Sequence, residues 1–281
     1  MRESLPQLTM LRDPARNEIQ TTRWLAVLAV VALAVSGCTS PAVLQSAPTQ
    51  PDAVGPEGFS VSGGLGLGSR ARLRGNVALV ARPLETLGVY AGGLWALSDS
   101  SGRGGPTSHL NHRYAEVGVL GAVPIGADAG LVLTGGIAGG VGAVESGGSF
   151  RSTCGLFTCD TRSYVLSADA SRASVQVGTQ FADGVRNVSF GLRIARSTFR
   201  NVQRDGIEVE DTGFWVAEPY TGASYPIGFG SLDLDVVIAS VLGDVEQTPD
   251  ISGTRPLYAV DPITVNVGLT LDLARVWKEV R

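Results

Sequence analysis

The sequence predicts an all-β fold, an up-and-down antiparallel transmembrane β-barrel of about ten strands. Three observations predict it. From Phe59 onward, apolar residues recur at every second position, as on a strand with one apolar and one polar face. The connections between these segments alternate between tight and long. A segment typical of an export signal precedes them, so the chain is expected to leave the cytoplasm.

The alternation with a period of two defines the strands. It is clearest near the C-terminus, where six apolar residues alternate with polar residues or glycine: Ile263, Val265, Val267, Leu269, Leu271 and Leu273. Strand boundaries drawn from sequence alone are accurate to within a few residues. The expected strands are 58–68, 71–82, 87–97, 112–124, 130–144, 163–181, 186–199, 213–225, 231–242 and 263–273.

The connections indicate how the strands are threaded. Tight connections are expected at Pro83–Thr86, Ile125–Ala129, Ala182–Val185 and Pro226–Gly230. Long ones, rich in Gly, Ser, Asp and Thr, are expected at Ser98–Asn111, Glu145–Arg162, Arg200–Thr212 and Gly243–Pro262. Barrels of the bacterial outer membrane have short periplasmic turns and longer extracellular loops. An even number of strands then places both ends of the barrel on the periplasmic side.

The composition of the polar face indicates which face meets lipid. That face is mostly Gly, Ser, Thr, Asn and Gln, and the chain contains one lysine, Lys278. A solvated outer face usually carries many charged residues. We therefore expect the apolar face to point outward. On the last strand, Val267 and Leu269 should face lipid, while Asn266 and Thr270 face the lumen.

Charged residues on the polar face are expected inside the barrel, where opposite charges offset the cost of burying each other. They fall into two layers by the expected threading. Arg72, Arg74, Arg172, Glu116 and Glu218 belong toward the outer end. Arg82, Arg193, Asp233, Asp235 and Asp272 belong toward the periplasmic end.

The leader contains an apolar run, residues 24–35, directly after Arg23. The run is too short to span a bilayer, which takes roughly 20 residues. The sequence Val35-Ser36-Gly37-Cys38 that follows resembles the lipobox of bacterial lipoproteins. That resemblance implies cleavage before Cys38 and attachment of lipid to its sulfur. The alternative is an ordinary signal peptide with a chance cysteine.

The organisation that follows has three parts: a removed signal peptide at 1–37, a flexible proline-rich linker at 38–57, and a barrel at 58–281. Translation starts at Met1 or at Met10. Residues 58–275 resemble small bacterial outer-membrane barrels of eight to ten strands, although the chain does not end on an aromatic residue, as many of those barrels do. The resemblance implies an outer-membrane protein, anchored by lipid, with both termini periplasmic.

The remaining cysteines, Cys154 and Cys159, have four residues between them and lie within one long connection. Exported proteins meet an oxidising compartment, which favours a disulfide between them. A metal site would need further ligands, and no histidine is near. We expect neither a metal nor a cofactor.

The chain's two histidines, His109 and His112, fall in or beside the first long connection. Some small outer-membrane barrels are proteases or lipid deacylases that use His with Asp or Ser at the outer rim, but no such motif matches here. Three-residue spacing in a loop also fixes no zinc geometry for His109, His112 and Glu116. The sequence therefore predicts a protein that is not an enzyme.

The function expected from the sequence is structural, adhesive or partner-binding, exerted through the extracellular loops. The partners would be outer-membrane lipid, the covalent lipid on Cys38, and an extracellular ligand or other envelope proteins. A net charge of −4 does not favour nucleic acid. Two alternatives remain open. One is an outer-membrane hydrolase, either protease or lipid deacylase, that uses the His109/His112 loop. The other is a narrow pore.

Overall fold

A computed structural model describes residues 42–44, 58–68, 73–84, 86–100, 108–126, 130–154, 159–182, 187–242, 258–260, 262–273 and 276–277. The predicted signal peptide, Cys38 and Arg72 lie outside these residues. Among the described residues, no helix is both long and apolar enough to cross a membrane.

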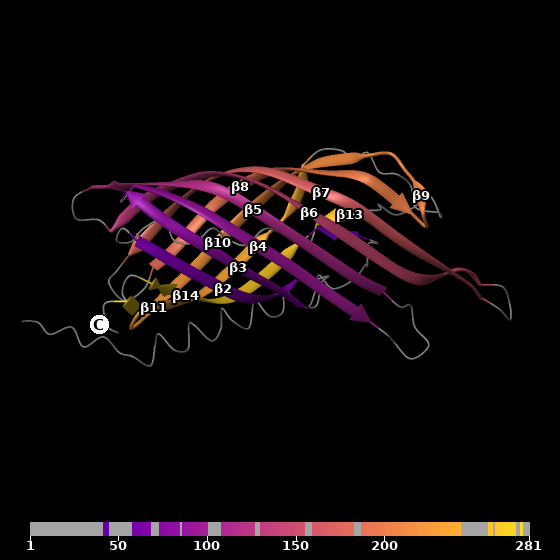
Figure 1. The fold of residues 1–281 in the computed structure, drawn as a ribbon, viewed down its shortest axis with the longest axis horizontal. Helices are drawn as coiled ribbons and strands as arrows, with labels where there is room; N and C mark the ends of the chain where they lie inside the picture. The colour runs from indigo at the N-terminus through magenta and orange to yellow at the C-terminus, as the bar shows by residue number, and fades with distance from the viewer. Residues whose placement is uncertain are drawn as a thin grey trace, which may run out of the picture. The chain divides into compact units, whose positions relative to one another are not determined.

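The described chain forms a closed antiparallel barrel of ten long strands, as the alternation predicts (Figure 1). Neighbouring strands follow sequence order, and pairing of β14 with β2 and of β10 with β8 completes the ring. The strands are β2 (Gly58–Gly68), β3 (Leu73–Leu84), β4 (Leu87–Ser100), β5 (Ser108–Ile125), β6 (Leu131–Cys154), β7 (Cys159–Ala182), β8 (Asn187–Arg204), β10 (Thr212–Ile227), β11 (Gly230–Ile238) with its continuation β12 (Ser240–Leu242), and β14 (Ile263–Asp272).

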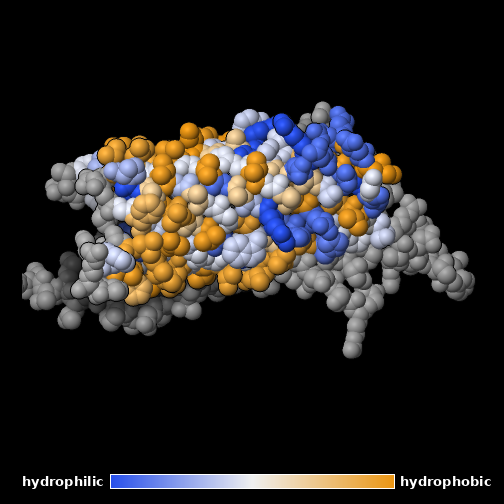
Figure 2. Space-filling view, in the orientation of Figure 1, coloured by the Kyte–Doolittle hydropathy of each residue, from blue (hydrophilic) through white to orange (hydrophobic). Residues whose placement is uncertain are grey.

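Side-chain exposure shows which face of the wall points outward. On β14, Val267 is 51% exposed and Leu269 41% exposed, whereas Asn266 is 4% exposed. Large apolar residues are likewise exposed on each of the remaining long strands. The face drawn in Figure 2 is a broad apolar wall, with hydrophilic residues gathered toward one end. An apolar exterior around a polar interior is the arrangement of a membrane-spanning barrel.

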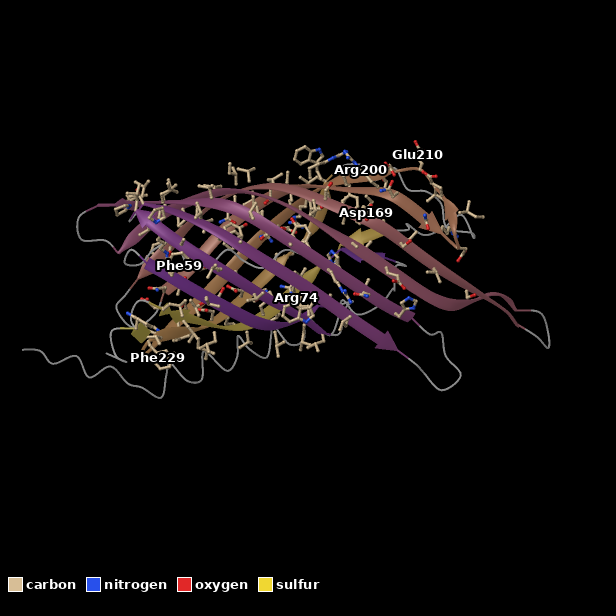
Figure 3. The ribbon with its side chains drawn as sticks, in the orientation of Figure 1. Phe59, Arg74, Asp169, Arg200, Glu210 and Phe229 are labelled. Carbon is tan, nitrogen blue, oxygen red and sulfur yellow. The ribbon has the colours of Figure 1, made fainter. Side chains whose placement is uncertain are left out.

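The two ends of the barrel differ. Tight connections join β3 to β4 and β10 to β11, and β2 begins and β14 ends at that same end. We call it the turn end; Figure 3 labels Phe59 and Phe229 there. We call the opposite end the loop end; it includes the connection from β4 to β5 and that from β12 to β14. Asp169, Arg200 and Glu210 lie toward this end (Figure 3).

Several strands extend further toward the loop end than the sequence predicts. The predicted loops Glu145–Arg162 and Arg200–Thr212 are largely strand, because β6 continues to Cys154, β7 starts at Cys159 and β8 continues to Arg204. β8 then turns through Asp205 and Gly206 into the short β9 (Ile207–Glu208). Both turn residues have positive φ, 53° and 78°. Asp-Gly is a favoured pair for such a two-residue hairpin turn, so this hairpin could have been recognised from the sequence.

A short parallel pair lies apart from the barrel sheet. It joins β1 (Ala42–Leu44) to β13 (Tyr258–Val260), and β1 also lies close to β5 and β6. The pairing falls within the predicted linker and the predicted loop Gly243–Pro262, and the alternation does not predict it.

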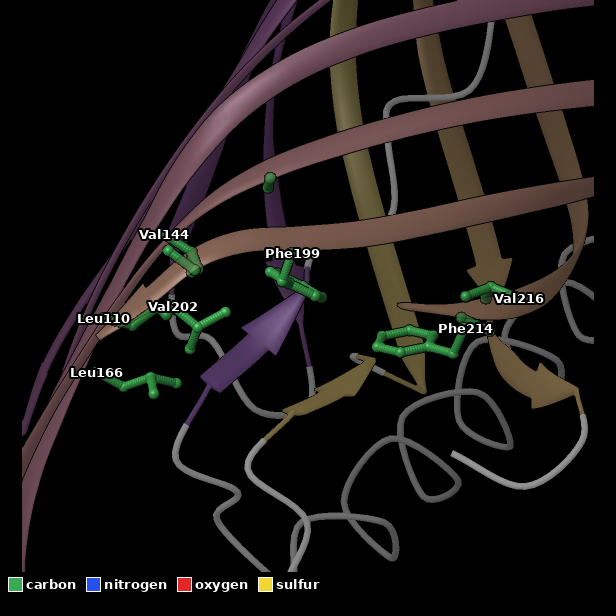
Figure 4. Packing of buried hydrophobic residues seen from close by; sticks show 10 residues of the cluster. Leu110, Val144, Leu166, Phe199, Val202, Phe214 and Val216 are labelled. Carbon is green, nitrogen blue, oxygen red and sulfur yellow. The ribbon is translucent and has the colours of Figure 1, made fainter. Parts of the chain in front are cut away.

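The interior near the loop end is apolar, contrary to the prediction of a polar lumen throughout. There the inward residues form a buried cluster (Figure 4): Leu110, Val144, Leu166, Ala168, Ala170, Phe199, Val202, Phe214, Val216 and Ala239. Outward positions on the same stretches carry polar residues such as Arg113, Glu145 and Asp169. Where the wall leaves the bilayer its exterior meets water, so the apolar side turns inward as in a soluble protein.

Candidate functional site

The centre of the lumen holds a layer of buried charges. The register places Glu218 of β10 directly opposite Arg193 of β8, and Arg193 Nε donates to Glu218 Oε2 at 2.5 Å. Arg172 of β7 donates from Nη2 to the same oxygen. The Glu218 side chain is 0% exposed, and both guanidinium groups are almost as deeply buried. Two guanidinium groups therefore share one carboxylate oxygen.

Glu116 and Arg74 extend this layer on the other side of the barrel. Both residues are buried. The Tyr90 hydroxyl donates to Glu116 Oε1 at 3.1 Å. Arg74 donates to Asn266 Oδ1 from Nε at 2.8 Å and from Nη2 at 2.5 Å. Each charge is therefore held by an oppositely charged or polar partner from another strand, which offsets part of its desolvation cost.

Glycines on the interior face make room for the tyrosines of this layer. A Cβ added at Gly140 would collide with the Tyr114 ring and with the carbonyl oxygen of Ala115. A Cβ at Gly191 would collide with the Tyr220 ring. The glycine-rich strand sequences thus reflect aromatic rings lying flat against the inner wall.

The charges nearer the turn end are less deeply buried than those of the central layer. Asp233 accepts from the Ser231 hydroxyl at 2.8 Å and from Thr270 Oγ1 at 2.6 Å. Asp235 and Arg82 line the same polar cavity of about 100 Å³. Asp272 is the last residue of β14, and its backbone N–H donates to the carbonyl of Phe229.

Among the described interior charges, Arg193 lies in a different layer from the one that the sequence predicts. The sequence predicts it near the periplasmic end, but it pairs with Glu218 in the central layer. Strands of a barrel are tilted and staggered, so residues at the same distance from their turns do not lie at the same height. The tilt raises Arg193 relative to Asp233 and Asp235.

The two histidines separate to opposite sides of the wall. The sequence predicts them in or beside a loop, but β5 begins at Ser108 and contains both. Residues three apart on a strand face opposite ways. His112 points inward, is 1% exposed and lies beside the Tyr114 ring at a centroid distance of 6.4 Å. His109 points outward, so the two cannot act as one pair.

His109 has a different partner, which the sequence does not single out. Its Nε2 lies 3.6 Å from Oε1 of Glu145 on β6, and both side chains are about half exposed, at 44% and 54%. The imidazole lies over Gly147, where any Cβ would collide with the ring. The alternation of faces along a strand could have indicated this contact, because it places His109 and Glu145 on the same face once β5 and β6 are paired.

A polar groove of about 460 Å³ adjoins this pair on the outer surface of the loop end. Its lining comes from β5 to β8: Asn111, Arg113, Ala143, Val144, Glu145, Ser167, Ala168, Asp169, Asn201 and Gln203. A β-bulge shapes one side, because Asn201 and Val202 of β8 both lie opposite the single residue Ala168 of β7. Asn201 in this bulge has a φ of 51° and donates from Nδ2 to Asp169 Oδ2 at 2.7 Å.

These features define what the described chain can do chemically. Phe199 and Leu166 are buried in the lumen at one level, and the ionic layer is buried at another. The described residues contain no group of three or more His, Cys, Asp or Glu placed to bind a metal ion. The outer rim, in contrast, presents a histidine–carboxylate pair next to a polar groove.

Comparison with known proteins yields similarities of structure only. No family model matches the sequence, and no curated protein matches it. The outer membrane protease OmpT from Escherichia coli aligns over 76% of this chain and 92% of its own, with 10% identity and a TM-score of 0.47. The translocator domain of the autotransporter NalP from Neisseria meningitidis aligns over 77% and 89%, with 13% identity and a TM-score of 0.46. The fold is that of an outer-membrane β-barrel.

A third structure, LpxR from Salmonella typhimurium, aligns over 76% of this chain and 99% of its own, with 8% identity and a TM-score of 0.33. The comparisons correct one prediction. The sequence predicts a protein that is not an enzyme, and this is contradicted, because the similar barrels include a protease. The role of each residue has to be argued from this chain.

Proposed function

We propose that this chain is an outer-membrane β-barrel hydrolase whose reactive pair, His109 and Glu145, lies on the outer rim. In this proposal the turn end faces the periplasm and the loop end faces the cell surface. The single observation that carries it is the approach of His109 Nε2 to Glu145 Oε1, 3.6 Å, at the edge of the polar groove. An exposed imidazole beside a carboxylate is an arrangement that general-base catalysis can use.

The chemistry follows from this geometry. In this proposal Glu145 lies beside the imidazole of His109 and orients it. His109 removes a proton from a water molecule, and the water oxygen attacks the carbonyl carbon of an ester or amide bound in the groove. The bond from that carbon to the leaving oxygen or nitrogen breaks, and His109 returns its proton to the leaving group. His112 takes no part, because it is buried inside the barrel.

The test is hydrolysis by the purified, detergent-folded barrel of panels of acyl esters and peptides. His109→Gln and Glu145→Gln should each lower kcat/KM, by about 100-fold or more for the histidine variant. Glu208→Gln is the matched control, because Glu208 is an exposed carboxylate on β9 at the same end of the barrel. No turnover by the wild type, or full turnover by His109→Gln, would show the proposal to be wrong.

We also propose that lipid on Cys38 tethers the barrel, as the lipobox-like sequence indicates. Cells labelled with radioactive palmitate should yield a labelled wild-type protein and an unlabelled Cys38→Ser variant. Label on that variant would disprove the assignment.

The Cys154–Cys159 disulfide also stays a proposal, and the backbone register supports it. The two residues are direct cross-strand partners where β6 ends and β7 begins. Opposed Cα atoms in an antiparallel pair lie about 4.5–5.5 Å apart, within the range that a disulfide spans. A membrane-impermeant thiol reagent should label whole cells only after reduction; labelling without reductant would contradict the bond.

A further inference from the structure

A second depression lies on the outer wall, on the side of the polar groove that faces the turn end. It is apolar, has a volume of about 580 Å³ and is lined from β3 to β6 by Leu79, Ala81, Val89, Tyr90, Ala91, Val117, Gly118, Val119, Ile137, Ala138 and Gly139. In one cross-strand row Leu79 pairs with Ala91, Ala91 with Val117, and Val117 with Gly139. Small residues thus alternate with large ones, and the small ones form the floor of the groove.

The apolar groove continues along the same strands toward the polar groove. On β5 the outward residues run from Val117 through Ala115 to Arg113, and on β6 from Gly139 through Val141 to Ala143. The four residue steps from Val117 to Arg113 span about 13 Å at roughly 3.3 Å per step. That length is within one lipid molecule, so a single amphiphile can occupy both grooves.

The boundary between the two grooves has the residues of a membrane interface. Arg113 is exposed, and its cross-strand partner on β4 is the exposed Trp95. Aromatic residues of membrane barrels gather at the level of the lipid head groups. An arginine there can bind a phosphate through two parallel hydrogen bonds.

The charges beyond this boundary are arranged for a head group that also carries a cation. Arg113 pairs with Ala143, and Ala143 with Asp169, so the carboxylate lies two strands from the guanidinium in the same row. Two strand spacings are about 9.6 Å between Cα atoms. Asn201 donates to Asp169 and holds this carboxylate in place. A phosphate at Arg113 and an ammonium group at Asp169 would satisfy both.

We propose that the outer wall binds one zwitterionic phospholipid, with an acyl chain in the apolar groove, its phosphate on Arg113 and its ammonium group on Asp169. The site requires only binding, so it stands whether or not His109 and Glu145 hydrolyse anything. If they do, the bound lipid lies next to the reactive pair.

The test is native mass spectrometry of the full-length barrel folded in nanodiscs that contain equal amounts of phosphatidylethanolamine and phosphatidylglycerol. The wild type should retain one phosphatidylethanolamine in preference to phosphatidylglycerol. Gly139→Leu should fill the apolar groove and lower total retention at least fivefold; its new Cβ would meet no atom nearer than 3.9 Å, so folding is preserved. Gly121→Leu is the matched control, because it is an outward glycine with equal space that does not line the groove.

The polar substitutions separate the two ends of the head group. Arg113→Gln should lower retention of both lipids, whereas Asp169→Asn should abolish only the preference for phosphatidylethanolamine. A wild-type preference for phosphatidylglycerol would overturn the zwitterionic assignment. Equal retention by the Gly139→Leu and Gly121→Leu variants would overturn the groove. Loss of hydrolysis in His109→Gln with lipid retention unchanged would leave this inference standing, which distinguishes it from the proposed function.

Discussion

Replacing Glu218 by glutamine tests the buried ionic layer. The substitution keeps the shape of the side chain but removes the charge that Arg172 and Arg193 share. All three side chains are almost completely shielded from water, so two guanidinium groups would lose their nearest compensating charge inside the barrel. Removing one partner of a buried ion pair costs about 3–5 kcal/mol of stability. We therefore expect Glu218→Gln to lose about that much free energy of unfolding, roughly a 100-fold or greater shift in the folded-to-unfolded ratio.

The measurement is urea unfolding of the barrel in lipid vesicles, followed by tryptophan fluorescence. A gel shift between unheated and boiled samples confirms that each variant folds. Glu145→Gln is the control, because its carboxylate is half exposed and the loss of an exposed ion pair costs less than about 1 kcal/mol. If Glu218→Gln unfolds within 1 kcal/mol of the wild type, the ionic layer is not a stabilising element and the argument is refuted.

Two further predictions concern the wall. Leu269→Arg, on the exposed apolar face, should lower the free energy of unfolding in vesicles by about 2–4 kcal/mol, whereas Thr270→Arg on the lumen side should lower it less. The reverse order of folding yields would mean that the faces are assigned the wrong way round. Gly140→Ala should lower the free energy of unfolding by about 1–3 kcal/mol, because its methyl group would collide with the Tyr114 ring and the Ala115 carbonyl. Gly139→Ala has room for its methyl group, so its free energy of unfolding should stay within about 0.5 kcal/mol of the wild type in the same assay.

The fold was predictable because side chains of a strand alternate between two faces, and in a membrane barrel one face is apolar and the other polar. The apolar side chains must face lipid, and the alternating connection lengths mark the two sides of the membrane. Thr270, Asn266, Val267 and Leu269 could therefore be assigned to a face without coordinates. The burial of Glu116, Arg172 and Glu218 in the lumen followed from the same parity.

The site was much less predictable, because its geometry depends on pairings between strands. Sequence alone grouped His109 with His112 by proximity, whereas the strand places them on opposite faces and pairs His109 with Glu145 from another strand. Sequence parity also predicted a uniformly polar lumen, and the apolar cluster around Phe199 shows that the parity inverts where the wall leaves the bilayer.

By itself the sequence determined the strand-by-strand threading and the face that meets lipid, since both follow from local periodicity. Only the tertiary structure decided the height at which each residue lies, and so which charges meet. Barrel closure imposes a tilt and a stagger on every strand. Arg193 reaches Glu218, and Arg113 shares a row with Asp169, because of that stagger, which no single strand encodes.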